Sequence, residues 1–576
     1  MRLQISRTKN AASLYIVKST YDKNGKRSNM IVEKLGTEAE LSKLHPDPIA
    51  WGKQRAEELT RLEKEAMQSI SVEYHPASRI EKGQKALYNG GYLFLQSLYY
   101  EYGMDKICKE ITQKYKFEYD LNAILSRLLY GRILFPGSKM STMEESRQLL
   151  EVPSFELHHI YRALEVISKE DSFIQSELYK NSLQVGERND SVLYYDCTNF
   201  FFETEEESGI RQYGPSKDHR PNPIVQMGLF MDGEGVPLTF SITPGNTNEQ
   251  QTLKPLEQQI ISEFGKKKFI VCTDAGLSST ANRKFNNIQG RAFITVQSLK
   301  KMKEYQKEWA LKRTGWKLKG SNLKYNLDEV DANRDEFYDK VFYKEEWFPE
   351  DGLEQRFIVT YSLKYKEYLQ RVRERQIQRA EKSITTGSVG KHRANDPERF
   401  VGQFYFTDTG EVAEHKAYTV DEKKIQEEEM FDGYYCTATN LEDPAEEILK
   451  VNQRRWEIEE SFRIMKSEFK ARPVFLSRDD RIKAHFITCF LALFLYRQLE
   501  KRLGDKFTTK EITSCLKNMT FHEVPREGYI PVYERTDLTD ALHASFGFST
   551  DYEFIPLSNL RKIFRHTKRN ETLCKN

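Results

Sequence analysis

The chain has 576 residues, more than one hydrophobic core usually supports, so several structural units are expected. Hydrophobic residues make up 39% and aromatic residues 12% of the chain, which excludes a largely disordered protein. The 88 basic and 86 acidic residues leave a net charge of +2, so total charge neither indicates nor excludes a polyanionic partner.

The seven cysteines are scattered without a C-x-x-C pair, which excludes zinc-finger spacing and is typical of a reducing cytosol. The N-terminus shows no apolar leader. The longest apolar run, residues 486–496, is too short to span a bilayer and is better explained as a buried helix. We therefore expect a soluble cytoplasmic protein.

The first 75 residues are predicted to form a β-hairpin and a helix. Apolar and polar residues alternate on both sides of Asn24-Gly25, a strong signal for a two-residue turn. A charged amphipathic helix follows at residues 48–67. Residues 76–187 have helical periodicity, and their short helices could pack as a DNA-binding helix-turn-helix or as a bundle that only supports the fold.

From residue 192 the pattern changes to β-strands. Three consecutive strands, a helix and two further strands are predicted at residues 191–203, 224–231, 236–245, 252–264, 268–274 and 292–298. Antiparallel strands followed by a helix-linked apolar strand predict a mixed α/β sheet.

Residues 300–430 are highly charged and are predicted to form an inserted domain. Between residues 300 and 324, nine basic residues face two acidic ones, which indicates either a DNA-facing surface or a solvated helix face. A returning strand is expected at residues 432–440. The next helix should begin with Asp443 as N-cap and Pro444 at its first position, and should run to about residue 470.

Two aspartates are predicted to end buried strands. Asp196 follows an apolar run at residues 193–195, and Asp274 follows another at residues 269–272. A carboxylate on rigid strand backbone can position a cation closely. Each aspartate alone could equally be a loop or helix cap, and a serine soon after Asp274 could cap the following helix.

Three charged residues share one stripe of the helix expected after residue 443. On a helical wheel of 100° per residue, Arg455, Glu459 and Lys466 lie within about 40° of one another, at the edge of the apolar face. Charges in such a position are costly unless they are paired or bind something. Glu457 and Glu460 point away and are predicted to be solvated. The alternative for the stripe is an internal ion pair between Arg455 and Glu459.

The segments YYDCTN, CTDAG and NQRRWEIEESFRIMK together resemble the three catalytic blocks of insertion-sequence DDE transposases of the IS-four group. That group carries a Y-x2-R-x3-E-x6-K signature. Arg455, Glu459 and Lys466 match its last three positions, while Asn452 stands where the group has tyrosine. The resemblance covers residues of about 190–500.

The resemblance implies an RNase H-like core, interrupted by the inserted domain. The core would occupy residues 188–299 and 431–500, with a C-terminal region at 501–576. It also implies that Asp196, Asp274 and Glu459 hold two Mg²⁺ ions, for which Mn²⁺ could substitute. Three such carboxylates should lie within roughly 10 Å of each other, and without metal at least one should have a raised pKa.

The implied activity is cleavage of transposon ends and strand transfer into target DNA, with a homodimer holding two ends. Arg455 and Lys466 would bind phosphates near the scissile bond, as could His219 and Arg220 in the loop GPSKDHR, although His219 could instead have a structural role. A tryptophan could stack on a flipped base. The candidates, each of which could equally be a core residue, are Trp309, Trp316 and Trp347.

Two other functions agree with the same residues. A metal-dependent nuclease would cut DNA without joining it, and a DNA-binding protein descended from a transposase would do neither. The presence of all three acids argues against the second alternative. Short inverted repeats flanking the gene would favour a mobile element.

Overall fold

The computed structural model describes residues 1–7, 12–21, 27–66, 77, 79, 82–83, 85–288, 290–350, 352–389, 396–406 and 415–569. Contacts between Cα atoms divide the chain into two units, Met1–Gln84 and Lys85–Asn576. Each unit is described separately.

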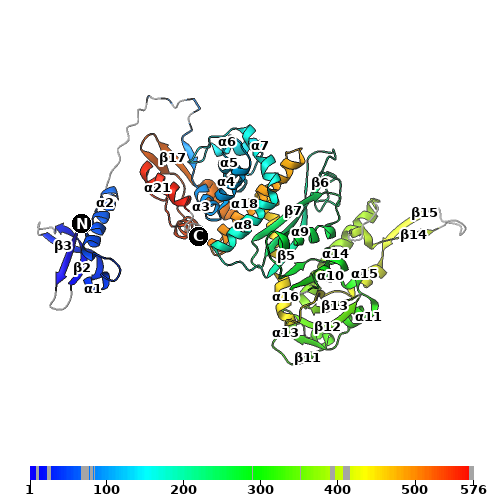
Figure 1. The fold of residues 1–576 in the computed structure, drawn as a ribbon. Coiled ribbons are helices and arrows are strands. Elements are labelled where there is room, and N and C mark those ends of the chain that lie inside the picture. The colour runs from blue at the N-terminus through cyan, green and yellow to red at the C-terminus, as the bar shows by residue number, and fades with distance from the viewer. Residues whose placement is uncertain are drawn as a thin grey trace. The chain divides into compact units, whose positions relative to one another are not determined.

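The N-terminal unit is a three-stranded antiparallel sheet with two helices (Figure 1). Its elements are β1 (Arg2–Arg7), β2 (Ala12–Tyr21), β3 (Arg27–Thr37), α1 (Glu38–Leu41) and α2 (Pro48–Ala66). Leu14, Ile16 and Val17 of β2 are buried beneath the helices. Strands β2 and β3 confirm the predicted hairpin and α2 the predicted helix, whereas the turn at Asn24-Gly25 lies outside the described residues.

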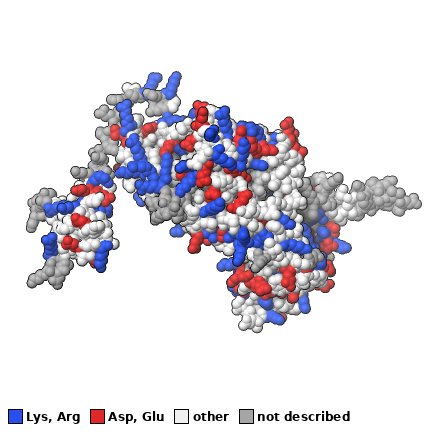
Figure 2. Space-filling view, viewed as in Figure 1, with Lys and Arg blue, Asp and Glu red and all other residues white. Residues whose placement is uncertain are grey.

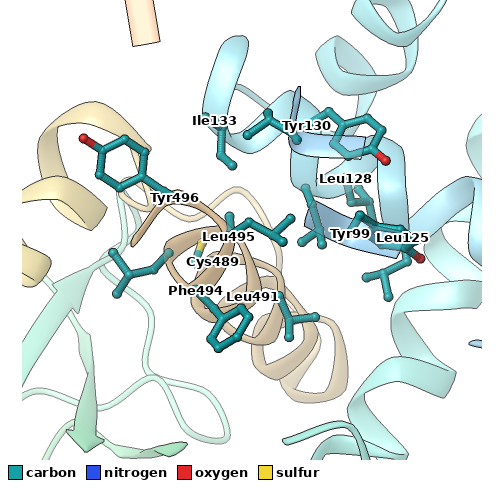
Figure 3. Close-up of a cluster of buried hydrophobic side chains, with 14 of the residues drawn as sticks. Tyr99, Leu125, Leu128, Tyr130, Ile133, Cys489, Leu491, Phe494, Leu495 and Tyr496 are labelled. Carbon is teal, nitrogen blue, oxygen red and sulfur yellow. The ribbon is translucent and has the colours of Figure 1, made fainter. Parts of the chain in front are cut away.

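After the short strand β4 (Leu87–Asn89), the second unit continues with six helices, in the region where helical periodicity was predicted. They are α3 (Tyr92–Glu101), α4 (Met104–Lys114), α5 (Leu121–Leu134), α6 (Lys139–Ser146), α7 (Leu157–Lys169) and α8 (Asp171–Val185). They surround α18 (Asp479–Arg502), which packs against α3, α5 and α7 (Figure 1). Figure 3 shows Leu495 of α18 beside Leu128 and Ile133 of α5. The apolar run predicted to be a buried helix is therefore the centre of this bundle.

Helix α18 is long and apolar enough to cross a membrane by length and composition alone. However, 89% of its most apolar window is buried inside the protein, as in the core helix of a globular fold. The helices around α18 supply that apolar environment.

Removing one buried side chain from α18 tests this packing. Leu491 is fully buried, so Leu491→Ala is expected to lower the free energy of unfolding by about 2–5 kcal/mol through lost transfer energy and a residual cavity. The matched control is Leu183→Ala on α8, because Leu183 is 46% exposed and should cost no more than about 0.5 kcal/mol. Denaturant unfolding compares the two, and equal losses would contradict the central position of α18.

Ten strands form one mixed sheet in the order β11-β10-β12-β13-β16-β9-β8-β5-β6-β7. The strands are β5 (Val192–Phe201), β6 (Ile224–Asp232), β7 (Pro237–Pro244), β8 (Phe269–Thr273), β9 (Arg291–Val296), β10 (Trp316–Leu318), β11 (Lys324–Tyr325), β12 (Phe342–Glu350), β13 (Leu353–Tyr361) and β16 (Tyr434–Thr439). Strands β5, β6 and β7 are antiparallel, and β8 and β9 run parallel to β5. This arrangement is that of an RNase H-like sheet, which confirms the predicted fold class. Helix α9 (Leu253–Ser262) connects β7 to β8, and α10 (Thr280–Phe285) connects β8 to β9.

Residues 300–430 add strands to this sheet. Strands β12 and β13 pair with each other, and β13 pairs with β16, the predicted returning strand. The helices of this region are α11 (Glu304–Leu311), α12 (Leu327–Ala332), α13 (Arg334–Phe337), α14 (Leu363–Thr385) and α15 (Glu422–Glu429). A separate two-stranded sheet is formed by β14 (Val401–Phe406) and β15 (His415–Val420).

The single helix predicted from Asp443 to about residue 470 is wrong in its start and its continuity. The N-cap of α16 (Ala445–Gln453) is Pro444. The chain then turns before α17 (Trp456–Arg463), which continues into a π-helical turn at Ile464–Glu468. Near this interruption, the buried amide of Asn452 donates to the Tyr435 hydroxyl, 3.1 Å away, and ties the end of α16 to β16.

The C-terminal region packs against the start of the helical bundle. Its elements are α19 (Thr509–Asn518), β17 (Thr520–Val524), β18 (Gly528–Pro531), α20 (Asp537–Phe546), β19 (Ile555–Pro556) and α21 (Leu557–Thr567). Strand β17 pairs with β4 (Leu87–Asn89), so segments more than 400 residues apart share one four-stranded sheet.

Candidate active site

Asp196 and Asp274 lie side by side on two parallel strands. In the pairing of β5 with β8, Leu193 is opposite Val271 and Tyr194 is opposite Cys272. Continuing this register by two residues brings Asp196 next to Asp274. Because neighbouring strands are about 5 Å apart, the two carboxylates share one small space.

The two aspartates occupy different positions on their strands. Asp274 directly follows the end of β8, as predicted. The expectation that Asp196 ends its strand is wrong, because β5 continues to Phe201 and Asp196 pairs with Leu229 of β6. The residues after Asp196 are buried and the partner strand β6 is long, so the β5–β6 ladder extends beyond the end of β8. Asp196 therefore lies at the point where β8 has ended and β5 is paired only with β6.

The Asp274 carboxylate is fixed by the tight turn that follows it. Its Oδ1 accepts a hydrogen bond from the Leu277 amide at 3.0 Å. Gly276 lies over the carboxylate, because a Cβ atom there would be 3.3 Å from both oxygens. The N-cap of α10 is Ser279, whose side chain accepts from the Asn282 amide. Asp274 is thus not the N-cap of α10, whereas its carboxylate does cap the turn at residues 274–277.

Burial raises the pKa of Asp196 to about 6, and the neighbouring Asp274 carboxylate adds to this rise. This pKa is lowered, in the opposite direction, by Lys217, the Cys197 amide and Arg455. The Cys197 amide donates to Asp196 Oδ1 at 2.7 Å. The expected raised pKa is confirmed, although desolvation contributes more than the like charge. A cation between the two carboxylates would relieve both effects.

Two cations of the predicted stripe face this pair. Arg455 is the N-cap of α17, and the charge of its guanidinium works to lower the pKa of both Asp196 and Cys272 of β8. Lys466 lies in the π-helical turn with a side chain only 13% exposed. Burial and the nearby Lys217 lower the pKa of Lys466 to about 8, while Asp196 opposes this change. A phosphate bound here would restore the pKa of this ammonium.

Glu459 lies on α17, one turn beyond Arg455, with its side chain exposed. Both residues are described, and no ion pair joins them, so the internal Arg455–Glu459 pair considered as an alternative is wrong. Within the described ranges, no group of three or more His, Cys, Asp or Glu side chains is close enough to hold a metal ion. The structure therefore brings Asp196, Asp274, Arg455 and Lys466 together and leaves the Glu459 carboxylate at the helix surface.

A family model described as a transposase DDE domain matches residues 188–495, more than half of the chain. The chain belongs to this family of DDE transposases. No curated protein matches it. Among solved structures, it is similar to piggyBac transposase in a synaptic complex with hairpin DNA, with 10% identity, a TM-score of 0.37, and coverage of 85% of this chain and 88% of that chain.

Within the DDE domain, the prediction that Glu457 and Glu460 are solvated is wrong. Their side chains are 16% and 25% exposed. Burial raises the pKa of Glu457, which lies against Gly235 in the β6–β7 turn. Glu460 pairs with Arg463 at 3.0 Å and lies 3.7 Å from Arg497 of α18. The helical wheel failed because the β6–β7 turn and α18 cover the face that it assigned to solvent.

Lys217 joins the site and was missed by sequence reasoning. Although burial opposes it, Asp196 and Glu249 raise the pKa of Lys217. Its ammonium donates to the Cys197 carbonyl and lies 3.3 Å from Glu249. The fully buried Asn199 of β5 holds this loop by accepting from the Lys217 amide at 3.2 Å. The sequence indicates the loop GPSKDHR, but only contacts with β5 distinguish Lys217 from the other residues of this loop.

The other two residues of the loop lie at its surface. His219 is exposed and has a φ of 53°, a conformation that histidine rarely adopts outside turns. Arg220 is exposed and lies over the Phe201 ring, 4.3 Å from its centroid. Both are accessible to a phosphate, and neither forms a hydrogen bond or ion pair with the aspartate pair.

The three candidate tryptophans differ in exposure. Trp316 is fully buried, and Trp309 is half-buried against Phe348, so both have core roles. Trp347 on β12 is 39% exposed, with Arg356 over its ring. Trp347 is the only one of the three whose face is open to solvent.

Proposed function

We propose that this DDE transposase cleaves DNA at transposon ends and joins the freed strands to target DNA, with Asp196, Asp274 and Glu459 as its catalytic carboxylates. The observation that carries the proposal is the adjacent Asp196–Asp274 pair. Its partly buried acids, one with a raised pKa, face Arg455 and Lys466. Perturbed acids beside cations in a family of DNA-cutting enzymes support phosphoryl-transfer chemistry.

Divalent ions, which DDE transposases normally use, fit this donor set. Asp196 and Asp274 provide carboxylate oxygens from adjacent strands, and repulsion between them is relieved by a cation. Glu459 would complete the set after a change of rotamer, because its side chain is exposed and has no ion-pair partner among the described residues. When bound, two Mg²⁺ ions would supply an activated water and stabilise the leaving oxygen.

The chain's own cations would hold the DNA strand. Arg455 offers a planar fork to a phosphate, and Lys466 offers a compact charge whose low pKa rises when an anion binds. Lys217 is positioned by Asn199 and the Cys197 carbonyl on the other side of Asp196. These three side chains would orient the scissile phosphate against the aspartate pair. His219 and Arg220 would contact the strand farther from the pair.

Truncating the two cations of the helix tests this DNA contact. Arg455→Ala and Lys466→Ala are each expected to weaken binding of end DNA and reduce joining. Each lost phosphate contact should flatten the log-log salt dependence of binding by about one unit. Arg463→Ala on the same helix is the matched control, because Arg463 is 58% exposed and pairs with Glu460. Parental binding by both variants at every salt concentration would contradict the assignment.

An assay with DNA that carries the ends flanking the gene, a target plasmid and Mg²⁺ or Mn²⁺ tests the activity itself. Cleaved ends together with joined products are expected. Cleavage without joining would indicate the nuclease, and binding without cleavage would indicate the inactive DNA-binding protein. Because two ends must be joined, we further propose a homodimer in the complex with DNA, which light scattering on the end-bound protein would detect.

A further inference from the structure

A cavity of about 200 Å³ lies outside the aspartate site, where the start of α6, the segment after the π-helical turn and α18 meet. Arg132, Lys139, Lys470 and Arg472 line it, and no acidic side chain does. Figure 2 shows basic and acidic side chains interspersed over the visible face of residues 85–569.

Lys139 is the decisive residue of this cavity. It is 4% exposed, and no hydrogen bond or ion pair joins its ammonium to any described residue. It is also the first residue of α6, where the helix dipole disfavours a cation. Burial and Arg132 lower its pKa to about 7. A buried ammonium without a counter-ion is costly, so the position is explained best by an anion that binds it.

The neighbouring groups do not supply that anion. Arg132 is 3% exposed and donates to the carbonyls of Phe469, at 3.0 Å, and Gly137, at 3.2 Å, while its Nε atom has no partner. Burial holds the pKa of His485 well below its usual range, and its ring contacts the Ala471 carbonyl, so it stays neutral. Two buried cations thus face the cavity without a carboxylate.

Arg472 differs from these two cations because it already has a counter-ion. It pairs with Asp218, which lies 3.8 Å from Lys466 of the aspartate site. Phe475, which also lines the cavity, is 67% exposed. The cavity therefore combines cationic side chains with an apolar wall of Pro473, Phe475 and Leu476. Asp218 links its Arg472 to Lys466 of the aspartate site.

We infer that this cavity binds a phosphate group. A phosphate dianion would neutralise Lys139, and the charge of the buried Arg132 beside it would add to the attraction. The volume exceeds that of one water, roughly 30 Å³, severalfold. The apolar wall leaves room for the sugar or base that a nucleotide phosphate carries. The phosphate has two possible sources, free phosphate or the phosphorylated end of a nucleic-acid strand. The inference does not depend on the proposed cleavage.

Thermal melting of the full chain in inorganic phosphate, against chloride at equal ionic strength, tests the inference. The parent is expected to gain about 2–3 °C at phosphate concentrations a hundredfold above the dissociation constant. Lys139→Met should melt higher than the parent in chloride, because a buried uncompensated charge is removed, and should no longer respond to phosphate. Lys517→Met is the matched control, an exposed lysine over Phe135 that should respond like the parent.

Calorimetry with oligonucleotides separates the two sources. If a strand end is the ligand, a 5′-phosphorylated oligonucleotide should bind the parent at least tenfold more tightly than its 5′-hydroxyl counterpart, and Lys139→Met should abolish the difference. If free phosphate is the ligand, the two oligonucleotides should bind equally while inorganic phosphate still stabilises the parent. The inference is overturned if phosphate does not shift the parent more than chloride, or if Lys139→Met responds as the parent does.

Discussion

Asp196→Asn and Asp274→Asn are each expected to slow strand cleavage by about 10³-fold or more while leaving end binding largely intact. A metal-holding carboxylate supplies several kcal/mol of transition-state stabilisation, and about 1.4 kcal/mol corresponds to a factor of ten in rate. Asparagine keeps the shape of the side chain and removes the charge. Single-turnover cleavage of labelled end DNA measures the loss, and gel-shift binding measures what remains.

Stability measurements separate this loss from unfolding. The pKa of Asp196 is raised in the folded state, so this group stabilises the folded protein less as the pH rises from about 4 to about 6. Asp196→Asn should therefore melt at or above the parental temperature at pH 7. Asp339→Asn is the control, because Asp339 is 80% exposed in residues 300–430 and should leave cleavage unchanged. Parental cleavage by either site variant would remove that residue from the mechanism.

The sequence predicted the parts of this site that depend on local pattern. Asp196 and Asp274 follow apolar runs, and short apolar runs of this kind are typical of buried strands. Their parallel pairing is allowed by the long connection through β6, β7 and α9, because parallel neighbours need a crossover. The mixed sheet and the buried apolar run of α18 were predictable for the same reason.

Features that depend on distant contacts were not predictable. The solvent face of α17 was misassigned because Arg497, some 40 residues later, and the β6–β7 turn cover Glu457 and Glu460. The sequence pattern predicts one continuous helix, because nothing local shows that Asn452 is tied to β16. Lys139 begins an ordinary helix in sequence, and only the backbone carbonyls that hold Arg132 and the packing of α18 place it in a cavity.

The role of Glu459 distinguishes a site with three catalytic carboxylates from a site with two. Glu459→Gln is expected to reduce cleavage by about 10³-fold, like the aspartate variants, because it would remove a metal ligand. Glu459 is exposed and has no ion-pair partner in the described part of the chain, so the change should alter the free energy of unfolding by no more than about 0.5 kcal/mol. Arg455 lies one turn before Glu459, and its charge works to lower the pKa of Asp196. This stripe of the helix therefore faces the aspartate pair.

Glu457→Gln and Glu460→Gln are the matched controls on the same helix, and each should keep cleavage within about tenfold of the parent. Glu457 faces the β6–β7 turn and Glu460 faces Arg463 and Arg497, so neither can turn toward Asp196 without breaking its packing. Calorimetric titration with Mn²⁺ gives a second readout, in which only Glu459→Gln should weaken binding. If Glu459→Gln binds Mn²⁺ and cleaves like the parent while Glu457→Gln does not, then Glu457 is the third carboxylate in place of Glu459.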